Sequence, residues 1–79
     1  MTTGSLKIEV GCITKMAESL WLAERTPNFG AQTQHCTSYP NAMAFLSAAC
    51  SIDLSADRVS NVGLEQYTVG YWHIPPVVT

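Results

Sequence analysis

The chain has 79 residues, with six acidic and four basic side chains and a formal net charge of −2. Hydrophobic residues make up 47% of the sequence and charged residues 13%, which excludes simple disorder, because disorder requires low hydrophobicity and high charge. The length allows one small domain, and so few basic residues do not supply the positive surface that nucleic-acid-binding proteins use.

Serine and threonine occupy fifteen positions, so we expect a neutral, hydroxyl-rich surface with little charge repulsion between molecules. We therefore expect the protein to self-associate or to stay bound to a partner protein. The three cysteines, Cys12, Cys36 and Cys50, are odd in number and widely spaced, unlike the even set of a disulfide-stapled secreted domain. No apolar run approaches the ~20 residues of a membrane span. We predict a cytoplasmic protein with reduced thiols.

Two segments open the chain. Residues 1–5 are short and polar and are predicted to form a disordered N-terminal tail, which leaves residues 6–79 as a single domain. Residues 6–14 alternate between apolar and charged or polar side chains, the period of a half-buried strand. Gly11 is placed to mark the end of this strand or a bulge in it.

The period then changes. Apolar side chains at positions 13, 16, 17 and 20 fall on one helical face, and the alanines nearby favour helix. This pattern predicts a first helix over residues 15–25, with Thr14 as its cap. The helix is expected to end before Pro27 and Gly30, which favour a turn.

The second half of the chain gives a similar alternation of elements. Residues 31–37 are polar and are predicted to form a strand, placed at an edge of the sheet. Ser38 is suited to cap a second helix, with Pro40 in its first turn. A broad apolar face makes this helix the expected buried centre of the domain, ending near Ser51.

The remaining segments are predicted to be a loop and a strand. Residues 52–62 favour a loop, in which residues 55–58 could form one helical turn. Residues 63–74 are rich in β-branched and aromatic side chains and predict a strand, which Gly70 could kink or divide. The two prolines that follow cannot donate to a ladder and are expected to end pairing. The order of elements predicts an α+β fold: a small, mainly antiparallel sheet with two helices packed on one face.

Side chains that could carry catalysis or hold a metal ion are scattered. Cysteines and histidines occur without metal-ligand spacing, and adjacent strand residues such as His35 and Cys36 point to opposite faces. We therefore predict no metal site, no cofactor and no catalytic residues, and hence a protein that is not an enzyme. Two alternatives stay open. One is a small oligomeric enzyme or ligand-binding protein with a pocket at a subunit interface near Cys36 and His73, and the other is a purely structural subunit of a larger assembly.

The aromatic side chains are the most informative feature. A run of four large ring-bearing residues lies in the last predicted strand: Tyr67, Tyr71, Trp72 and His73. Both faces of that strand carry large groups, while helices can cover only one. Two interpretations stay open, a central strand closed by the tail or by a second copy, or a contact surface; a homodimer satisfies both. Trp21, between two leucines, raises the same question, so these five residues are the predicted partner-binding set.

The ending Thr68-Val69-Gly70-Tyr71-Trp72-His73 is similar to a C-terminal strand in one family of type I anti-CRISPR proteins, and the similarity covers under a tenth of the chain. That resemblance implies a single small domain, encoded by a phage or mobile element, that occupies a surface of a CRISPR effector or its nuclease. Many of those inhibitors are acidic, whereas this chain is nearly neutral. The difference disfavours DNA mimicry and favours apolar and hydrogen-bonded contacts.

Taken with the resemblance, the sequence predicts a small non-enzymatic inhibitor that blocks a host defence complex by steric occlusion in the host cytoplasm. Its expected partner is a larger host protein, with no direct contact to nucleic acid or membrane.

Overall fold

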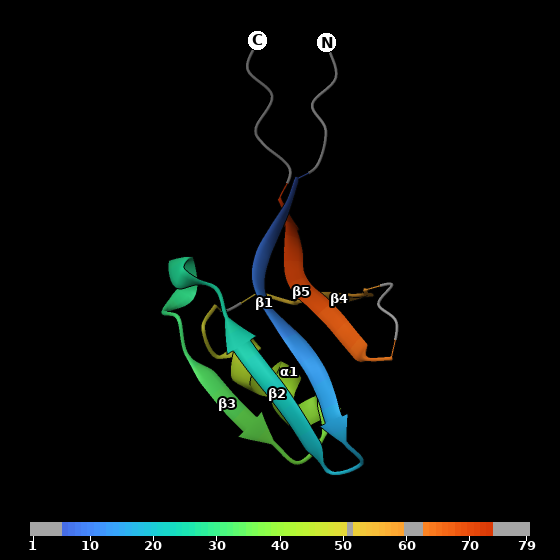
Figure 1. Ribbon diagram of the computed structural model, residues 1–79. Coiled ribbons are helices and arrows are strands. Elements are labelled where there is room, and N and C mark those ends of the chain that lie inside the picture. The colour runs from blue at the N-terminus through green and yellow to red at the C-terminus, as the bar shows by residue number, and fades with distance from the viewer. Residues whose placement is uncertain (1–5, 51, 60–62, 74–79) are drawn as a thin grey trace, which may run out of the picture.

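A computed structural model describes residues 6–50, 52–59 and 63–73. Along the chain they form β1 (Leu6–Ala17), β2 (Leu20–Arg25), the 3-10 turn η1 (Pro27–Phe29), β3 (Thr33–Cys36), α1 (Tyr39–Ser47), β4 (Ser55–Arg58) and β5 (Glu65–His73). The strands make one antiparallel sheet in the order β3-β2-β1-β5-β4 (Figure 1). The structure thus has the expected antiparallel sheet with α-helix, but one α-helix in the described residues instead of two.

The helix predicted over residues 15–25 is wrong, because this segment forms the turn and second strand of a hairpin. β1 continues to Ala17 and pairs with β2, so that Lys15 lies opposite Trp21 and Ile13 opposite Ala23. In this register Trp21 and Ala23 are buried, while the leucines on either side of Trp21 are not. The apolar residues of this segment fit the 3.6-residue period of a helix and the two-residue period of a strand. Pairing with β1 and β3 favours the strand.

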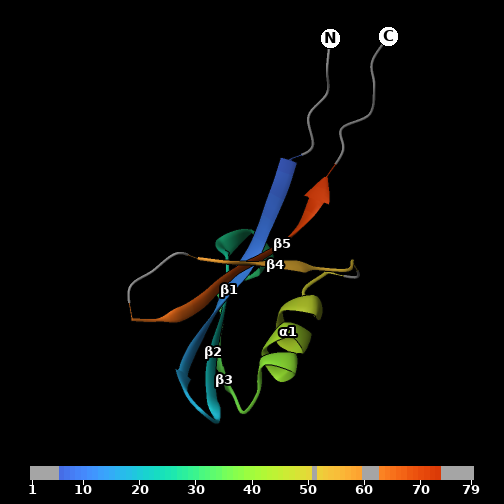
Figure 2. The same cartoon turned by 90° about the vertical axis from the view of Figure 1, so that its right-hand side faces the viewer.

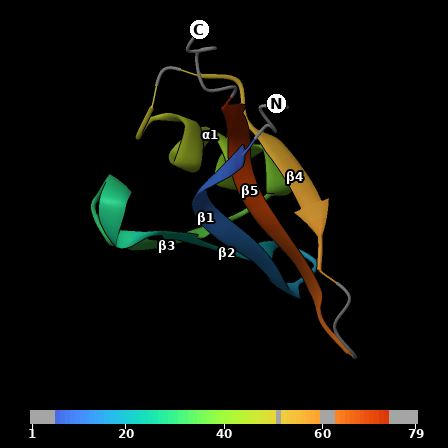
Figure 3. The ribbon, with the colours of Figure 1, turned by 90° about the horizontal axis from the view of Figure 1, so that it is seen from above.

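The predicted second helix is confirmed as α1, which ends at Ser47, earlier than expected. The Ser38 side chain accepts a hydrogen bond from the Asn41 backbone N–H at 3.3 Å, and a proline occupies the first turn. One face of α1 buries Ala42 and Leu46 completely. Figures 2 and 3 show that the sheet curves around α1, which covers one of its two faces. The other face has no helix over it in the described residues.

The core lies between α1 and the strands on which it packs. Its fully buried side chains come from the centre of the sheet and from the helix: Val10, Ile13, Ala23, Ala42, Leu46 and Val69. Arg25 closes the C-terminal end of α1. Its Nη2 donates to the Phe45 carbonyl oxygen at 2.8 Å, and its guanidinium lies 4.1 Å from the centre of the Phe45 ring. A cation at this end also suits the helix dipole.

Two glycines allow the close approach of neighbouring backbones where β1 bends. A bulge in β1 lies between Glu9 and Gly11, as the sequence suggested. A Cβ on Gly11 would lie 2.1 Å from the Glu24 carbonyl oxygen, and one on Gly70 would lie 2.2 Å from the Ile8 carbonyl oxygen. Neither position can therefore accept a side chain without a shift of the backbone. β5 runs through Gly70 as one continuous strand.

Two further segments, residues 31–37 and 55–58, can be compared with their predicted secondary structure. The polar segment over residues 31–37 does form an edge strand, β3. The loop or helical turn expected over residues 55–58 is wrong, because these residues form β4, whose Ala56 lies opposite Val69 and packs against the core. The predicted N-terminal tail and the terminal prolines lie outside the described residues.

Candidate functional site

The five predicted partner-binding residues separate into two groups. Trp21 is only 8% exposed, and its ring meets the Tyr39 ring edge-on at 5.5 Å between centres. Tyr39 in turn meets Tyr67 at 5.2 Å. These three rings from β2, α1 and β5 pack edge to face along the side of the sheet that α1 covers, so Trp21 and Tyr67 lie in or against the core.

A hydrogen bond fixes the position of Tyr67, at one end of this row of aromatic rings. The Tyr67 hydroxyl donates to Glu65 Oε2 at 2.7 Å. That bond, with smaller contributions from burial and from the charge of Glu65, raises the pKa of Tyr67 above its ordinary value. The phenol is therefore neutral at physiological pH, as a structural hydrogen-bond donor.

The other predicted residues lie on a two-stranded arm, formed by residues 6–9 of β1 and residues 71–73 of β5. β2 pairs with β1 only from Gly11 onward, and β4 pairs with β5 only up to Gly70. The arm therefore extends past both neighbouring strands (Figure 1). On it Tyr71 is half-buried against the core, while Trp72 and His73 are exposed.

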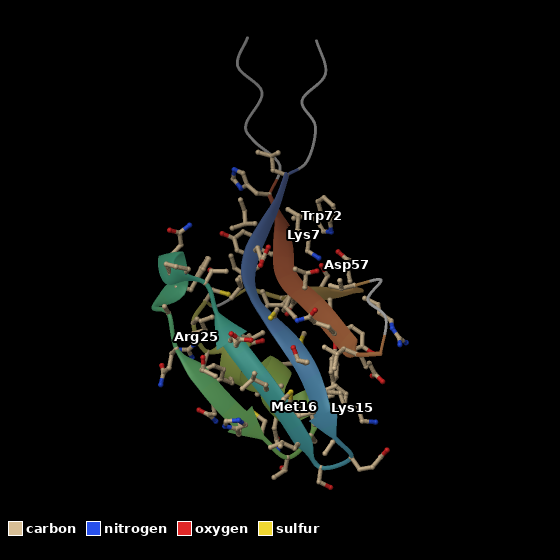
Figure 4. The ribbon with its side chains drawn as sticks, in the orientation of Figure 1. Lys7, Lys15, Met16, Arg25, Asp57 and Trp72 are labelled. Carbon is tan, nitrogen blue, oxygen red and sulfur yellow. The ribbon has the colours of Figure 1, made fainter. Side chains whose placement is uncertain are left out.

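Trp72 is the largest exposed side chain of the arm, at 56%. It lies opposite Lys7, whose Nζ is 6.0 Å from the centre of the indole ring. The same Nζ forms an ion pair with Asp57. Figure 4 shows the three side chains together at the side of the sheet. Lys7, on β1, thus contacts side chains of both β4 and β5, and its ammonium group lies beside the exposed indole of Trp72.

The face of the sheet turned away from α1, here called the open face, carries Trp72 and the Lys7–Asp57 pair. Its centre has small polar and thiol side chains, among them Thr14, which accepts a hydrogen bond from Gln66 Nε2 at 3.1 Å. Cys12 also lies there, with its thiol 3.8 Å from Glu24 Oε1. Three of the four basic residues, Lys15, Arg25 and Arg58, lie on the opposite side, as their contacts and register show.

Charge is therefore unequal between the two sides of the sheet. The open face has three carboxylates, on Glu9, Glu24 and Asp57, against the single cation of Lys7. Burial, and then the charge of Glu24, raise the pKa of the Cys12 thiol, with a smaller contribution from Glu9. The thiol is protonated at neutral pH and is a poor nucleophile. The open face is therefore an acidic surface with the exposed Trp72 at one end.

The structure does not bring Cys36 and His73 together within one chain. Cys36 is buried although it lies in a polar segment, while His73 is exposed at the end of the arm. β2 and β1 separate their strands, and the register places Cys36 level with Glu65. Three strand spacings and eight residues along β5 put the two side chains about 30 Å apart.

The cysteines, the potential metal ligands and the surface depressions were the other candidates for a functional site. All three cysteines are free thiols. Among the described residues no group of three or more histidine, cysteine or acidic side chains could hold a metal ion. In the same part of the chain, no helix has the length and apolar character needed to cross a bilayer. An open depression of about 500 Å³ beside the end of α1 is lined by Met43, Ser47, Cys50, Ile52, Asp53 and Leu54.

No protein-family model matches the chain, and no similar protein was found among curated sequences or solved structures.

Sequence reasoning did not find the partners of Trp72. Lys7 and Asp57 are fifty residues apart in the chain, and no pattern in the sequence connects them. The alternation of residues 6–14 did place Lys7 on the polar side of its strand. Only the pairing of β1 with β5, and of β5 with β4, brings Lys7, Trp72 and Asp57 onto one surface.

Proposed function

We propose that the protein is a non-enzymatic inhibitor that binds a larger protein through the arm and the open face, with Trp72 as the anchor. The observation that supports this proposal most directly is the exposure of a tryptophan beside an ion pair, on a face that no helix covers within the described residues. Tryptophan is among the residues that most often dominate binding energy at protein interfaces. A second large apolar side chain of the arm, Leu6, is 60% exposed, on the side of the arm opposite to Trp72.

The charge of the open face suggests the chemistry of the partner. Three carboxylates against one cation favour a protein surface that presents lysine or arginine, because complementary charge speeds association and selects the partner. The same carboxylates disfavour direct binding to nucleic acid, whose phosphates carry the same sign. The proposed partner surface is therefore basic, with an apolar pocket for the indole.

The resemblance of residues 68–73 to one anti-CRISPR family makes a type I CRISPR effector the first partner to test. These residues run along β5 from the core into the arm, so they include the proposed anchor. On this proposal the protein is phage-encoded, acts in the host cytoplasm, and blocks the effector by occupying a basic surface.

Two measurements test the proposal. Purified type I effector complexes and their nuclease are assayed for binding, and phage plaques are counted on cells with an active type I system that express the protein. Because a hot-spot side chain contributes about 2 kcal/mol or more, Trp72→Ala should weaken binding at least about 30-fold and abolish protection of the phage. Leu64→Ala is the matched control, since Leu64 is 46% exposed and outside the arm.

Both variants should keep the circular dichroism spectrum of the parent protein. Equal binding by Trp72→Ala and Leu64→Ala would contradict the role of the arm. Tyr71 is half-buried against the core, so its replacement would confound folding with binding. The alternative of an interface pocket near Cys36 and His73 predicts that Cys36 reacts with iodoacetamide faster than a free thiol at neutral pH; its burial leads us to expect slower reaction.

A further inference from the structure

The outer edge of β3 has backbone groups without a partner in the described residues. Arg25 N–H donates to the Gln32 carbonyl oxygen at 2.9 Å. In an antiparallel ladder, hydrogen-bonded pairs alternate, so Gln34 and Cys36 direct their backbone groups toward β2. Thr33 and His35 therefore direct their N–H and C=O groups outward, and no described residue bonds to them.

This edge has none of the devices that usually prevent one sheet from pairing with another. Edge strands are commonly protected by charged side chains, proline or a bulge. β3 has the sequence Thr-Gln-His-Cys, without aspartate, glutamate, lysine, arginine or proline, and it pairs with β2 in a regular register. Its first three side chains are exposed.

The opposite edge of the sheet, β4, makes an informative comparison. Val59 N–H donates to the Gln66 carbonyl oxygen at 2.8 Å, so by the same alternation Ala56 and Arg58 direct their backbone groups outward. The exposed residue between them is Asp57. Both edges thus present two outward residues around one central side chain, which is neutral Gln34 in β3 and charged Asp57 in β4.

We propose that β3 pairs antiparallel with β3 of a second copy, with the two-fold axis at Gln34. Thr33 of each copy then exchanges backbone hydrogen bonds with His35 of the other, which makes four hydrogen bonds in total. Gln34 lies opposite Gln34, where two amide side chains can bond to each other. The same arrangement at β4 would set Asp57 against Asp57, which is destabilising.

The result is a continuous ten-stranded sheet with both copies of α1 on one side. The low charge of the chain, −2 in total, offers little repulsion to this association. Four residues per strand bury less than a standard interface, so the dimer is expected to be weak, with a dissociation constant on the order of 100 µM. This proposal is independent of partner binding through the arm.

Sedimentation equilibrium tests the dimer. The apparent mass should rise from 8.6 kDa toward twice that value as concentration increases, up to about 1 mM for so small an interface. His35→Pro removes an outward N–H and leaves the ladder with β2 intact, as edge prolines do. Gln34→Lys sets two like charges on the axis. Both variants should stay monomeric, whereas the neutral control Gln34→Thr should dimerise.

Amide hydrogen exchange by NMR gives a second readout that folding alone would not produce. The Thr33 and His35 amides should gain protection as concentration rises, while the Gln34 and Cys36 amides should be protected at every concentration. A monomer throughout this range, or a dimer that survives in both His35→Pro and Gln34→Lys, would overturn the proposal. So would concentration-dependent protection of β4 in place of β3.

Discussion

The region of the sheet under α1 and the arm differ in what holds them together. Under the helix, Ile13 and Leu46 are fully buried between two layers. In the arm, two strands pair only with each other, and Leu6 and Trp72 are largely exposed. An isolated two-stranded ribbon is marginally stable in water, so the arm depends on the continuation of β1 and β5 into the covered region. Stability is concentrated under the helix, while the arm leaves large apolar side chains exposed, as the proposed partner-binding role requires.

The largest loss of stability is expected from a substitution in the region of the sheet under α1. Leu46→Ala removes a fully buried side chain and should lower the free energy of unfolding by about 2–5 kcal/mol, because the cavity left behind adds to the lost burial. Leu6→Ala, in the arm, should change it by less than about 0.5 kcal/mol. Urea denaturation followed by circular dichroism measures both. Similar losses from the two variants would show that the arm carries as much of the stability as the core.

A smaller effect is expected where β2 holds the end of α1. Arg25→Met removes the hydrogen bond to the Phe45 carbonyl oxygen and should cost about 1 kcal/mol. The Nε atom of Arg25 is buried with no partner among the described residues, and its removal offsets part of the loss. Thermal unfolding measures the change. Arg25→Lys, which keeps the charge, should recover part of it; unchanged stability in Arg25→Met would exclude the capping role.

The smallest change in stability is expected at high pH, from the titration of Cys12 on the open face. Burial and Glu24 raise the pKa of Cys12 above its ordinary value of 9.0, so the folded chain holds this proton more tightly than the unfolded chain. The resulting stabilisation is fully present below pH 9.0 and is lost as the pH rises through the pKa of the folded state. Cys12→Ala should therefore flatten the decline of unfolding free energy above this pH. An identical decline in the variant would place the alkaline titration elsewhere, with Tyr67 the next group to examine.

Local signals in the sequence account for several elements. Ser38 followed by a proline predicted the start of α1, because a capping side chain and a fixed φ angle act within one turn. Alternation predicted β1, and aromatic composition predicted β5. The polar composition of the segment before Ser38 favoured a strand at an edge, where polar side chains are tolerated, but it did not by itself decide that the segment pairs as a strand.

The failures have a common cause. In residues 15–25 the apolar side chains fit a helix and a strand equally well, and helix propensity is a weak preference that tertiary contacts override. In residues 55–58, polar and charged side chains gave no strand signal, yet pairing with β5 made them β4. The aromatic residues near the C-terminus could not be divided between core and surface, because this division depends on where α1 lies.

The amino-acid sequence by itself determined the α+β class, the capped helix, β5 and residues 6–14 of β1, since each depends on propensities and periods that neighbouring residues settle among themselves. Only the tertiary structure decided that Trp21 and Tyr67 lie against the helix while Trp72 stays exposed beside Lys7 and Asp57. Those positions follow from the order and register of five strands, and register is fixed by contacts between residues far apart in the chain.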